Sequence, residues 1–311
     1  MCRRRSCAEL PGSPAILIPM ENLFANKELL VQGRRLVVHT AGSGTPLLLL
    51  HGGGADSALL SWGAIAPELA QSYRVILPNW PGYGGSEPRG DTLRSEDLPD
   101  IVEELRRWIG VERIRLVGIS LGGLASVGYA LKYPHRAERV AVFGCGGVQD
   151  RAPYHAIAWV FLHLPLLGRA MAVAQWSSFA KNQKLLTKSL KSLFPTTEAV
   201  PAELPGLVAQ ELQSRSDQSV FFKWQRDEIR LGGLKTNFTD RLPDLACPVL
   251  MIHGTKDIAV PVKYARRAAS LIHDVSYHEI DGAGHWIPRE MPETAAELLR
   301  GFFERVSQPP A

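Results

Sequence analysis

Short apolar runs alternate with helical patterns along most of this chain of 311 residues, and this alternation is the feature that most constrains its fold. Several runs, such as the four leucines at 47–50, are apolar at every position, which is typical of strands covered by helices on both faces of a sheet. Between the runs, segments such as 101–108 and 293–306 place their apolar side chains on one helical stripe. Repeated β-α-β units predict an α/β fold with a mostly parallel sheet. The predicted strands comprise residues 36–39, 47–51, 73–78, 114–118, 140–143, 249–253 and 275–280.

The alternation is interrupted between residues 148 and 243, where helical and loop-like patterns occur without a convincing strand. We therefore expect a helical cap, 148–243, inserted into one α/β core that comprises 27–147 and 244–307. The apolar part of the cap, 156–176, is expected either to line the cleft beneath it or to form the core of the cap. Residues 1–26 are expected to be a poorly ordered leader. Two alternatives fit this segment: it is a short targeting leader, or the start codon is misplaced and the true start is residue 20.

Composition and charge argue against several classes of function. Hydrophobic residues make up 45% of the chain and charged residues 21%, as in ordinary globular proteins. The net charge of +4 comes partly from three arginines at 3–5 and not from a basic patch interleaved with aromatic residues, so we expect no nucleic-acid partner. The most apolar stretch, 156–176, contains His163, Pro165 and Arg169, which argues against an integral membrane span.

The cysteines are widely separated and form neither a C-x-x-C pair nor a spacing typical of metal sites. We therefore expect free thiols in a reducing compartment and assign the protein to the cytoplasm. Neither a cofactor nor a metal is predicted, and the oligomeric state is left open. The four residues are Cys2, Cys7, Cys145 and Cys247.

A Gly-x-Ser-x-Gly pentapeptide centred on Ser120 follows the predicted strand 114–118 and precedes a helical pattern at 124–133. On a sharp turn from strand to helix, the serine hydroxyl is exposed and the two outer positions, Gly118 and Gly122, have no room for side chains. Because such a pentapeptide often occurs by chance, its interpretation as a nucleophile requires a base and an acid elsewhere in the chain.

Both partners occur in the expected chain order. Asp257 follows the predicted strand 249–253, and His285 lies in a glycine-rich segment after the last predicted strand, so both lie at carboxyl ends of strands, where ligands bind in open α/β folds. A serine hydroxyl needs an imidazole to accept its proton, and a carboxylate fixes the imidazole tautomer. We predict Ser120 as nucleophile, His285 as general base and Asp257 as the acid. The alternatives are Asp281 as the acid, a loop-capping role for Asp257 and a surface position for His285.

The segment His51-Gly52-Gly53-Gly54 closes the second predicted strand and resembles the oxyanion loop of lipases and esterases. Glycines allow a backbone N–H group to approach a developing oxyanion closely. We expect the N–H groups of Gly53, or alternatively Gly54, and of Leu121 to form this hole. His51 is expected to hold the loop by hydrogen bonds and not to take part in the chemistry.

With the segments Tyr73-Arg74-Val75-Ile76-Leu77 and Pro81-Gly82-Tyr83-Gly84-Gly85-Ser86, these motifs resemble the α/β-hydrolase superfamily over about residues 30–306. The resemblance implies an eight-stranded, mostly parallel sheet with helices on both faces, a helical cap and serine hydrolase chemistry. The most similar branch is that of the meta-cleavage-product hydrolases, which cleave carbon–carbon bonds. They share the triple-glycine loop and a tryptophan after the histidine, here Trp286.

The sequence departs from that branch at two places. An asparagine typically precedes the nucleophile there and a second amide follows the oxyanion loop, whereas this chain has Ile119 and no amide side chain around Trp62-Gly63-Ala64. Since Ile119 cannot hydrogen-bond a dienolate, we expect hydrolysis of a carboxylic ester of a small apolar molecule through an acyl-enzyme. Ser120 argues against related enzymes that use an aspartate nucleophile. Carbon–carbon bond hydrolysis and a receptor function without catalysis are the alternatives.

Overall fold

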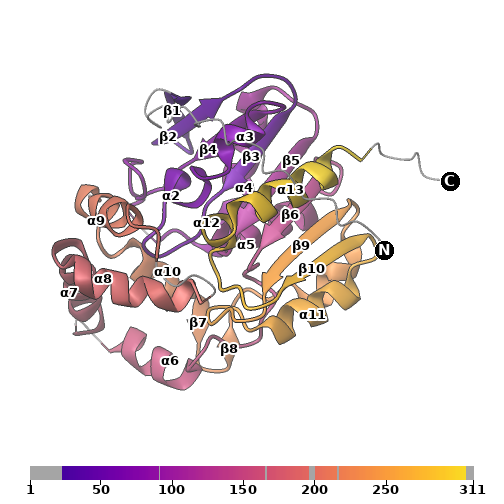
Figure 1. The fold of residues 1–311 in the computed structure, drawn as a ribbon. Coiled ribbons are helices and arrows are strands. Elements are labelled where there is room, and N and C mark those ends of the chain that lie inside the picture. Colours follow the sequence, from indigo (N-terminus) through magenta and orange to yellow (C-terminus); the bar gives the residue numbers. More distant parts are fainter. Residues whose placement is uncertain (1–22, 91, 165–166, 196–199, 216, 306–311) are drawn as a thin grey trace, which may run out of the picture.

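A computed structural model describes residues 23–90, 92–164, 167–195, 200–215 and 217–305. Its centre is an eight-stranded sheet with helices on both faces (Figure 1). The strands of this sheet are β1 (Ala25–Val31), β2 (Arg34–Ala41), β3 (Pro46–Leu50), β4 (Arg74–Pro78), β5 (Ile114–Ile119), β6 (Ala137–Phe143), β9 (Val249–Gly254) and β10 (Val275–Ile280). Their order is β1-β2-β4-β3-β5-β6-β9-β10, in which the β1–β2 and β2–β4 pairs are antiparallel and the other pairs are parallel. The predicted eight-stranded, mostly parallel α/β architecture is confirmed.

Strand β3 explains why an uninterrupted apolar run is required at the centre of the sheet. Leu47 and Leu49 belong to the hydrophobic cluster on one face, and Leu48 and Leu50 belong to the cluster on the other face. All four side chains are fully buried, because successive residues of a strand point to opposite faces and each face is covered.

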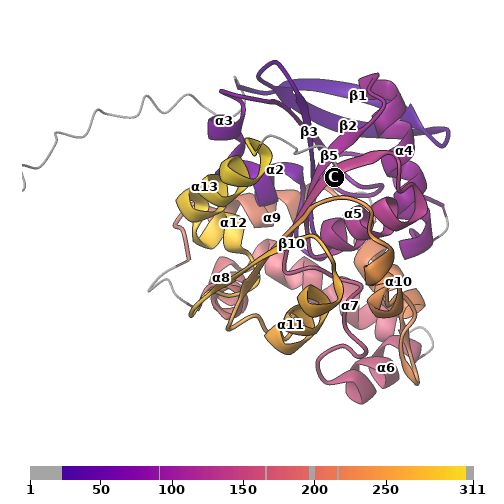
Figure 2. The same cartoon turned by 90° about the vertical axis from the view of Figure 1, so that its right-hand side faces the viewer.

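The two faces of the sheet are covered by different sets of helices (Figure 2). One face packs against the helices α2 (Ala58–Trp62), α3 (Ala66–Leu69), α12 (Ile287–Glu290) and α13 (Pro292–Phe303). The other face packs against α4 (Leu98–Ile109), α5 (Leu121–Lys132) and α11 (Val262–Leu271).

Strand β1 was not predicted from the sequence. Its first four residues are exposed, and Leu30 has 79% of its surface in solvent. An edge strand with one pairing partner needs no apolar run, so its sequence does not show the pattern of the central strands. It begins at Ala25, two residues before the expected start of the core, and residues 1–22 of the predicted leader lie outside the described residues.

Most of the described residues between β6 and β9 are helical. The interval also contains two short strands, β7 (Ile229–Arg230) and β8 (Gly233–Leu234), which pair antiparallel. The expectation of no strand in this interval was therefore wrong. Each strand has only two residues, which is too short to give a sequence pattern. The described residues also include short 3₁₀ segments at Ser95–Asp97, Lys191–Leu193 and Thr239–Asp244. The helices of this interval are α6 (His155–His163), α7 (Leu167–Lys181), α8 (Gln183–Leu190), α9 (Leu204–Ser214) and α10 (Val220–Glu228).

No single helix in the described part of the chain is long and apolar enough to cross a bilayer. Helices α6 and α7 together have the length and composition of such a span, but they are bent by 104° at the break between them. Cys145 and Cys247 are free and buried, as expected, whereas Cys2 and Cys7 lie outside the described residues.

Helix α5 packs unusually closely on the end of β3. A Cβ atom added at Gly122 would lie 2.0 Å from the carbonyl oxygen of Leu50, a distance that real Cβ atoms do not reach. This contact sets how near the first turn of α5 comes to the sheet.

The substitution Gly122→Ala should therefore lower the free energy of unfolding by about 1–3 kcal/mol through overpacking. Gly301→Ala is the matched control, since residue 301 is exposed in α13 and an added Cβ there meets nothing within 4 Å. Alanine has the higher helix propensity, so the control should gain about 0.5–1 kcal/mol. Urea unfolding of both variants measures the difference, and equal stabilities would contradict the packing argument.

Candidate active site

Ser120 lies at the junction of β5 and α5 in a strained backbone conformation, with φ +53° and ψ −110°. Its N–H group donates to the carbonyl of Phe143 over 3.0 Å, which ties the turn to β6. A Cβ atom at Gly118 would lie 2.2 Å from the carbonyl oxygen of Gly122, so the two outer positions of the pentapeptide are packed against each other. The strand, sharp turn and helix that the pentapeptide requires are all present.

His285 is held by a buried carboxylate. Its Nδ1 lies 2.7 Å from Oδ2 of Asp257, and Oδ1 of Asp257 accepts hydrogen bonds of 2.8 Å from the N–H groups of Ala259 and Val260. A carboxylate partner makes Nδ1 the protonated nitrogen and leaves Nε2 as the basic one.

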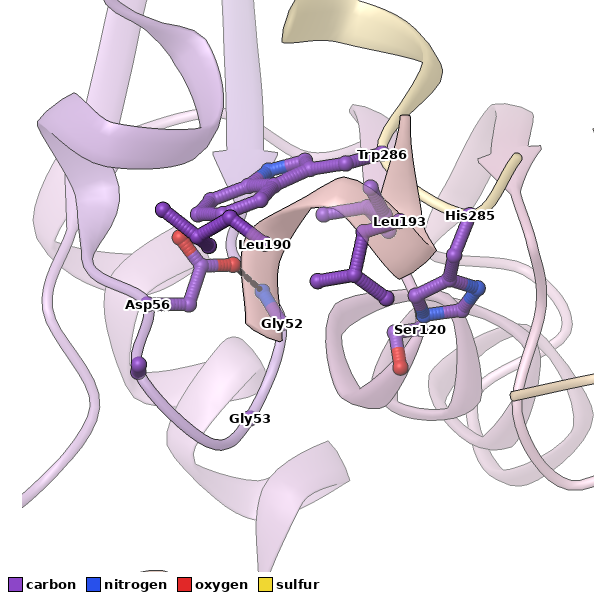
Figure 3. A pocket seen from close by; sticks show the side chains of 10 residues that line it. Gly52, Gly53, Asp56, Ser120, Leu190, Leu193, His285 and Trp286 are labelled. Carbon is purple, nitrogen blue, oxygen red and sulfur yellow. Dashed lines mark hydrogen bonds between the residues drawn. The ribbon is translucent and has the colours of Figure 1, made fainter. Parts of the chain in front are cut away.

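Ser120 and His285 line one cavity, next to the loop that carries Gly53 (Figure 3). Within the described part of the chain, no hydrogen bond joins the serine hydroxyl to the imidazole. Rotation about χ1 moves the hydroxyl without moving the backbone, and such bonds often tighten only when substrate binds. The arrangement has the parts that nucleophilic catalysis requires on one cavity wall.

The electrostatics of the pair oppose the effect of burial. Burial raises the pKa of Asp257, but the charge of His285 and its hydrogen bond lower it more, so the pKa lies below its usual value. Burial lowers the pKa of His285, but the charge and the hydrogen bond of Asp257, together with the charge of Asp56, raise it more, so the imidazole pKa lies above 6.5. Each group therefore stabilises the charged form of the other.

A second imidazole, that of His253, also lies near the carboxylate of Asp257; the sequence analysis did not identify it. His253 Nε2 is 3.4 Å from Oδ2 of Asp257 and 2.7 Å from the carbonyl oxygen of Val260. Burial lowers the pKa of His253 despite these partners, which favours a neutral ring that donates to Val260. The rival acid Asp281 is exposed and accepts a hydrogen bond of 3.1 Å from Thr255, so the geometry favours Asp257 as the partner of His285.

In the glycine loop after β3, the first N–H group is already occupied. Gly52 donates to Oδ2 of the buried Asp56 over 2.8 Å, whereas Gly53 lines the cavity with Ser120. A Cβ atom at residue 53 would lie 2.5 Å from the ring of Phe221, so a side chain there would require this ring of α10 to shift. Leu121 begins α5, where the N–H groups have no partner within the helix. Gly53 and Leu121 thus remain the predicted donors of the oxyanion hole.

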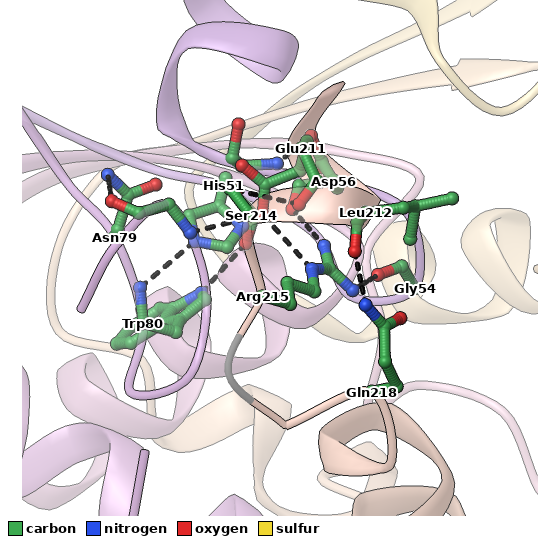
Figure 4. A network of polar contacts seen from close by, with 12 residues as sticks. His51, Gly54, Asp56, Asn79, Trp80, Glu211, Leu212, Ser214, Arg215 and Gln218 are labelled. Carbon is green, nitrogen blue, oxygen red and sulfur yellow. Dashed lines mark hydrogen bonds and ion pairs between the residues drawn. The ribbon is translucent and has the colours of Figure 1, made fainter. Parts of the chain in front are cut away.

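His51 holds this loop from inside the protein (Figure 4). Its Nδ1 lies 2.7 Å from the carbonyl oxygen of Gly52, and its Nε2 accepts from the N–H group of Trp80 over 3.0 Å. Burial lowers the pKa of His51 to about 3, so the ring stays neutral and can accept at one nitrogen while donating at the other. These are the contacts of a residue that supports the loop.

A buried arginine from the cap holds the same loop from outside (Figure 4). Arg215, which follows α9, donates to the carbonyl oxygens of Gly54 and Asp56 over 2.6 and 2.7 Å. Its Nε donates to Glu211 over 3.0 Å, and the same carboxylate accepts from the N–H group of Gly84 over 3.1 Å. The sequence did not identify this ion pair, because its members lie about 160 positions from the loop that they support.

Asp56 was also missed by the sequence analysis. Its carboxylate accepts from the N–H groups of Gly52 and Ser57 and from the hydroxyl of Ser61 over 2.8, 2.8 and 2.5 Å. Burial raises its pKa to about 6 in spite of these bonds. The side chain thus orders the loop beside Ser120 and places a carboxylate at the wall of the cavity.

Two cavities meet at Ser120, and apolar side chains form most of their walls. The smaller, of about 80 Å³, includes Asp56, Ile119 and Trp286, and the larger, of about 350 Å³, includes Phe221 and Glu228. Neither has a lysine or arginine among its described lining residues.

The apolar segment 156–176 contributes little to the described walls of these cavities. Among the described residues of this segment, Ala158 lines the larger cavity. The larger contributions come from Leu190 and Leu193 at the smaller cavity and from α10 at the larger one. The packing of the inserted helices on the core determines which of them reaches the cavities. An apolar stripe in the sequence does not show this packing.

Comparisons with known proteins agree with this fold. Residues 45–290 match the model of the family described as alpha/beta hydrolase fold. A 2-hydroxy-6-oxo-2,4-heptadienoate hydrolase of Pseudomonas putida is 25% identical over 284 residues, which cover 91% of this chain and 97% of the relative.

Two solved structures are similar in fold. A meta-cleavage product hydrolase of Pseudomonas fluorescens has a TM-score of 0.73 at 23% identity, with 89% of this chain and 97% of that one covered. A carboxylesterase of Bacillus subtilis has a TM-score of 0.68 at 19% identity, with 90% and 92% covered.

The acid can be identified by comparing two substitutions. Asp257→Asn should lower kcat by roughly 10,000-fold, because an amide leaves the imidazole in the wrong tautomer. Asp281→Asn is the matched control and should change kcat little, because Asp281 is exposed and bonded to Thr255. Steady-state kinetics of both variants make the test, and the reverse order of effects would transfer the role to Asp281.

Activity should also depend on the protonation of His285. Because the pKa of this imidazole lies above 6.5, kcat/KM should fall with decreasing pH through a midpoint above that value, where the base becomes protonated. Asp257→Asn removes the charge that raises this pKa and should move the imidazole titration, followed by NMR, to lower pH. A wild-type midpoint below 6.5, or a titration that the substitution leaves unmoved, would contradict the assignment.

Proposed function

Because the chain belongs to the α/β-hydrolase fold family, we propose that it is a serine hydrolase that cleaves carboxylic esters of small, neutral, apolar molecules. Ser120 attacks the ester carbonyl while Nε2 of His285 accepts the hydroxyl proton, and Asp257 stabilises the imidazolium. The N–H groups of Gly53 and Leu121 stabilise the oxyanion. His285 then protonates the leaving alcohol and later activates a water molecule, which releases the acid from the acyl-enzyme.

The observation that carries the choice of a neutral ester is the charge of the two cavities at Ser120. Their described walls include the carboxyl groups of Asp56 and Glu228 and no lysine or arginine. A substrate carboxylate bound there would lose its hydration and lie near these carboxyl groups without gaining a lysine or arginine as partner, which is costly in an apolar site. An uncharged ester avoids that cost, and the apolar walls favour its binding.

Hydrolysis of a carbon–carbon bond is the second candidate, and the comparison with the heptadienoate hydrolase favours it. A serine, a histidine and an oxyanion hole would serve that reaction as well. A dienoate is a carboxylate at neutral pH, however, and the cavity wall at Ile119 is apolar and fully buried. The charge and polarity of the site therefore favour the ester.

Side-by-side assays on p-nitrophenyl esters and on a meta-cleavage dienoate decide between these reactions. On the esters, kcat/KM should rise from acetate towards medium chains, by up to about fourfold for each buried methylene until the cavity is full. The dienoate should be turned over slowly. Faster cleavage of the dienoate than of every ester would overturn the ester assignment.

The variant Ser120→Ala is the control for both reactions. It should retain the fold but lose turnover and labelling by a fluorophosphonate, because the nucleophile is absent. Wild-type protein that resists the fluorophosphonate would instead support a receptor function, and full activity in the variant would exclude Ser120 as nucleophile.

A further inference from the structure

The cap contains a long segment in which every formal charge is positive. Residues 151–197 include six lysines and arginines and no aspartate or glutamate. Since the whole chain carries +4 and this segment +6, the remaining residues together carry −2. The six cations are Arg151, Arg169, Lys181, Lys184, Lys188 and Lys191.

These six side chains are exposed, and none forms an ion pair with a carboxylate in the described part of the chain. Many cations elsewhere on the protein do form such pairs, for example Arg266 with Glu279 over 2.7 Å. The charge of the segment is therefore not neutralised within the fold.

The same segment exposes an apolar helix face. Tyr154 precedes α6 directly, and Ile157, Val160 and Leu164 follow at intervals of three or four residues, so the four side chains recur on one side of the helix. Their exposed fractions are 83%, 71%, 52% and 40%. Helix α6 is held to the cap on its other side by Leu162, which belongs to a small buried cluster. The exposed stripe is thus not needed for that core, and such a patch marks a contact surface.

A cationic hollow adjoins the end of α6. His163 of α6 lines it together with Arg169 and with Lys223, Arg226 and Arg230 from α10 and β7. The carboxylate of Asp227 also lines the hollow and already pairs with Arg230 and with Lys235 over 2.9 and 2.8 Å. Lys223 pairs with Asp217 over 2.7 Å, so Arg169 and Arg226 are the arginines of the described lining without a carboxylate partner. The hollow can therefore accept an anionic group such as a phosphodiester.

We propose that this face, the apolar stripe of α6 with the cationic hollow beside it, docks on the surface of an anionic lipid bilayer. The stripe enters the boundary between headgroups and acyl chains, and the hollow binds a lipid phosphate. An apolar helix face flanked by lysine and arginine is the pattern of helices that lie in a membrane interface. The bend of 104° between α6 and α7 fits a pair of helices that lie on a bilayer rather than crossing it.

Charge argues against a second copy of this chain as the occupant. Two identical faces would bring the arginines of one hollow, Arg169 and Arg226, towards those of the other, and the carboxylate of Asp227 there is already paired. Like charges placed opposite each other oppose association, whereas an anionic bilayer attracts each of them.

The docking face is connected to the cavities at Ser120. Ala152, Pro153 and Ala158, which precede or belong to α6, border the larger cavity, and Leu190 at the end of α8 borders the smaller one. A docked cap would therefore place an ester dissolved in the bilayer near the entrance to the site. This extension rests on the proposed esterase function, but docking itself does not.

Vesicle sedimentation with the Ser120→Ala protein tests docking without hydrolysis of lipid. Vesicles of phosphatidylcholine alone are compared with vesicles of equal parts phosphatidylcholine and phosphatidylglycerol, at low and at high salt. The anionic vesicles should bind more protein, and salt should weaken that binding. Equal binding to both vesicles, or no binding, would overturn the proposal.

Two double variants separate the apolar and the ionic contributions. Ile157→Ser with Val160→Ser should lower the partition coefficient about tenfold or more and leave the salt dependence in place. Arg169→Gln with Arg226→Gln should lower binding by a similar factor and reduce the salt dependence. Lys27→Gln with Leu30→Ser is the matched control on β1, at the far edge of the sheet, and should bind like the parent protein. A control that loses as much binding as the cap variants would contradict the assignment of this face.

Two further measurements distinguish the outcomes. With Ser120 restored, the cap variants should hydrolyse soluble p-nitrophenyl acetate at the wild-type rate. If the esterase proposal is wrong, this assay shows no hydrolysis, whereas binding to vesicles in the sedimentation assay is unaffected. Size-exclusion chromatography should give the same oligomeric state for the parent protein and the Ile157→Ser variant. A dimer that this substitution dissociates would assign the face to a second copy and overturn docking on lipid.

Discussion

The close contact between α5 and the end of β3 is the constraint on which the candidate site depends. Because no Cβ atom fits between Gly122 and Leu50, the helix begins directly against the sheet, and the chain must turn sharply to enter it. Ser120 occupies that turn and adopts a backbone conformation with φ +53°, which few non-glycine residues tolerate. The strain is offset by the buried sheet on one side and the helix on the other. The same geometry places the serine beside the first N–H group of α5.

The loop that faces Ser120 is held by groups from three parts of the chain. His51 supports it from the core, Asp56 from within the loop and Arg215 from the cap. Each contact satisfies a backbone group that burial would otherwise leave without a partner. The segment 148–243 therefore supports the glycine loop after β3 and also contributes residues to the walls of the cavities. A shift of α9 would reach this loop through the buried ion pair between Arg215 and Glu211.

The two sides of the cap differ in what they present. Towards Ser120 it presents Leu190, Leu193 and Phe221, which suit an uncharged apolar substrate. Towards solvent, α6 presents Ile157 and Val160 beside unpaired cations. An apolar side over the cavities and an outer side that is apolar and cationic are consistent with a substrate that dissolves poorly in water.

The sequence by itself determined the order of the elements, the central strands, the serine turn and the two loops that carry Asp257 and His285. These features depend on local chemistry: an apolar run for a strand covered on both faces, and glycines where backbones touch. Tertiary structure decided the rest, because β1, Asp56, His253 and the pair of Glu211 and Arg215 carry no local pattern and owe their positions to contacts between distant segments. It also decided that α8 and α10 face the cavities while the apolar stripe of α6 faces solvent. A helical stripe specifies that one face is apolar, but what that face meets is set by how the helix packs on the core.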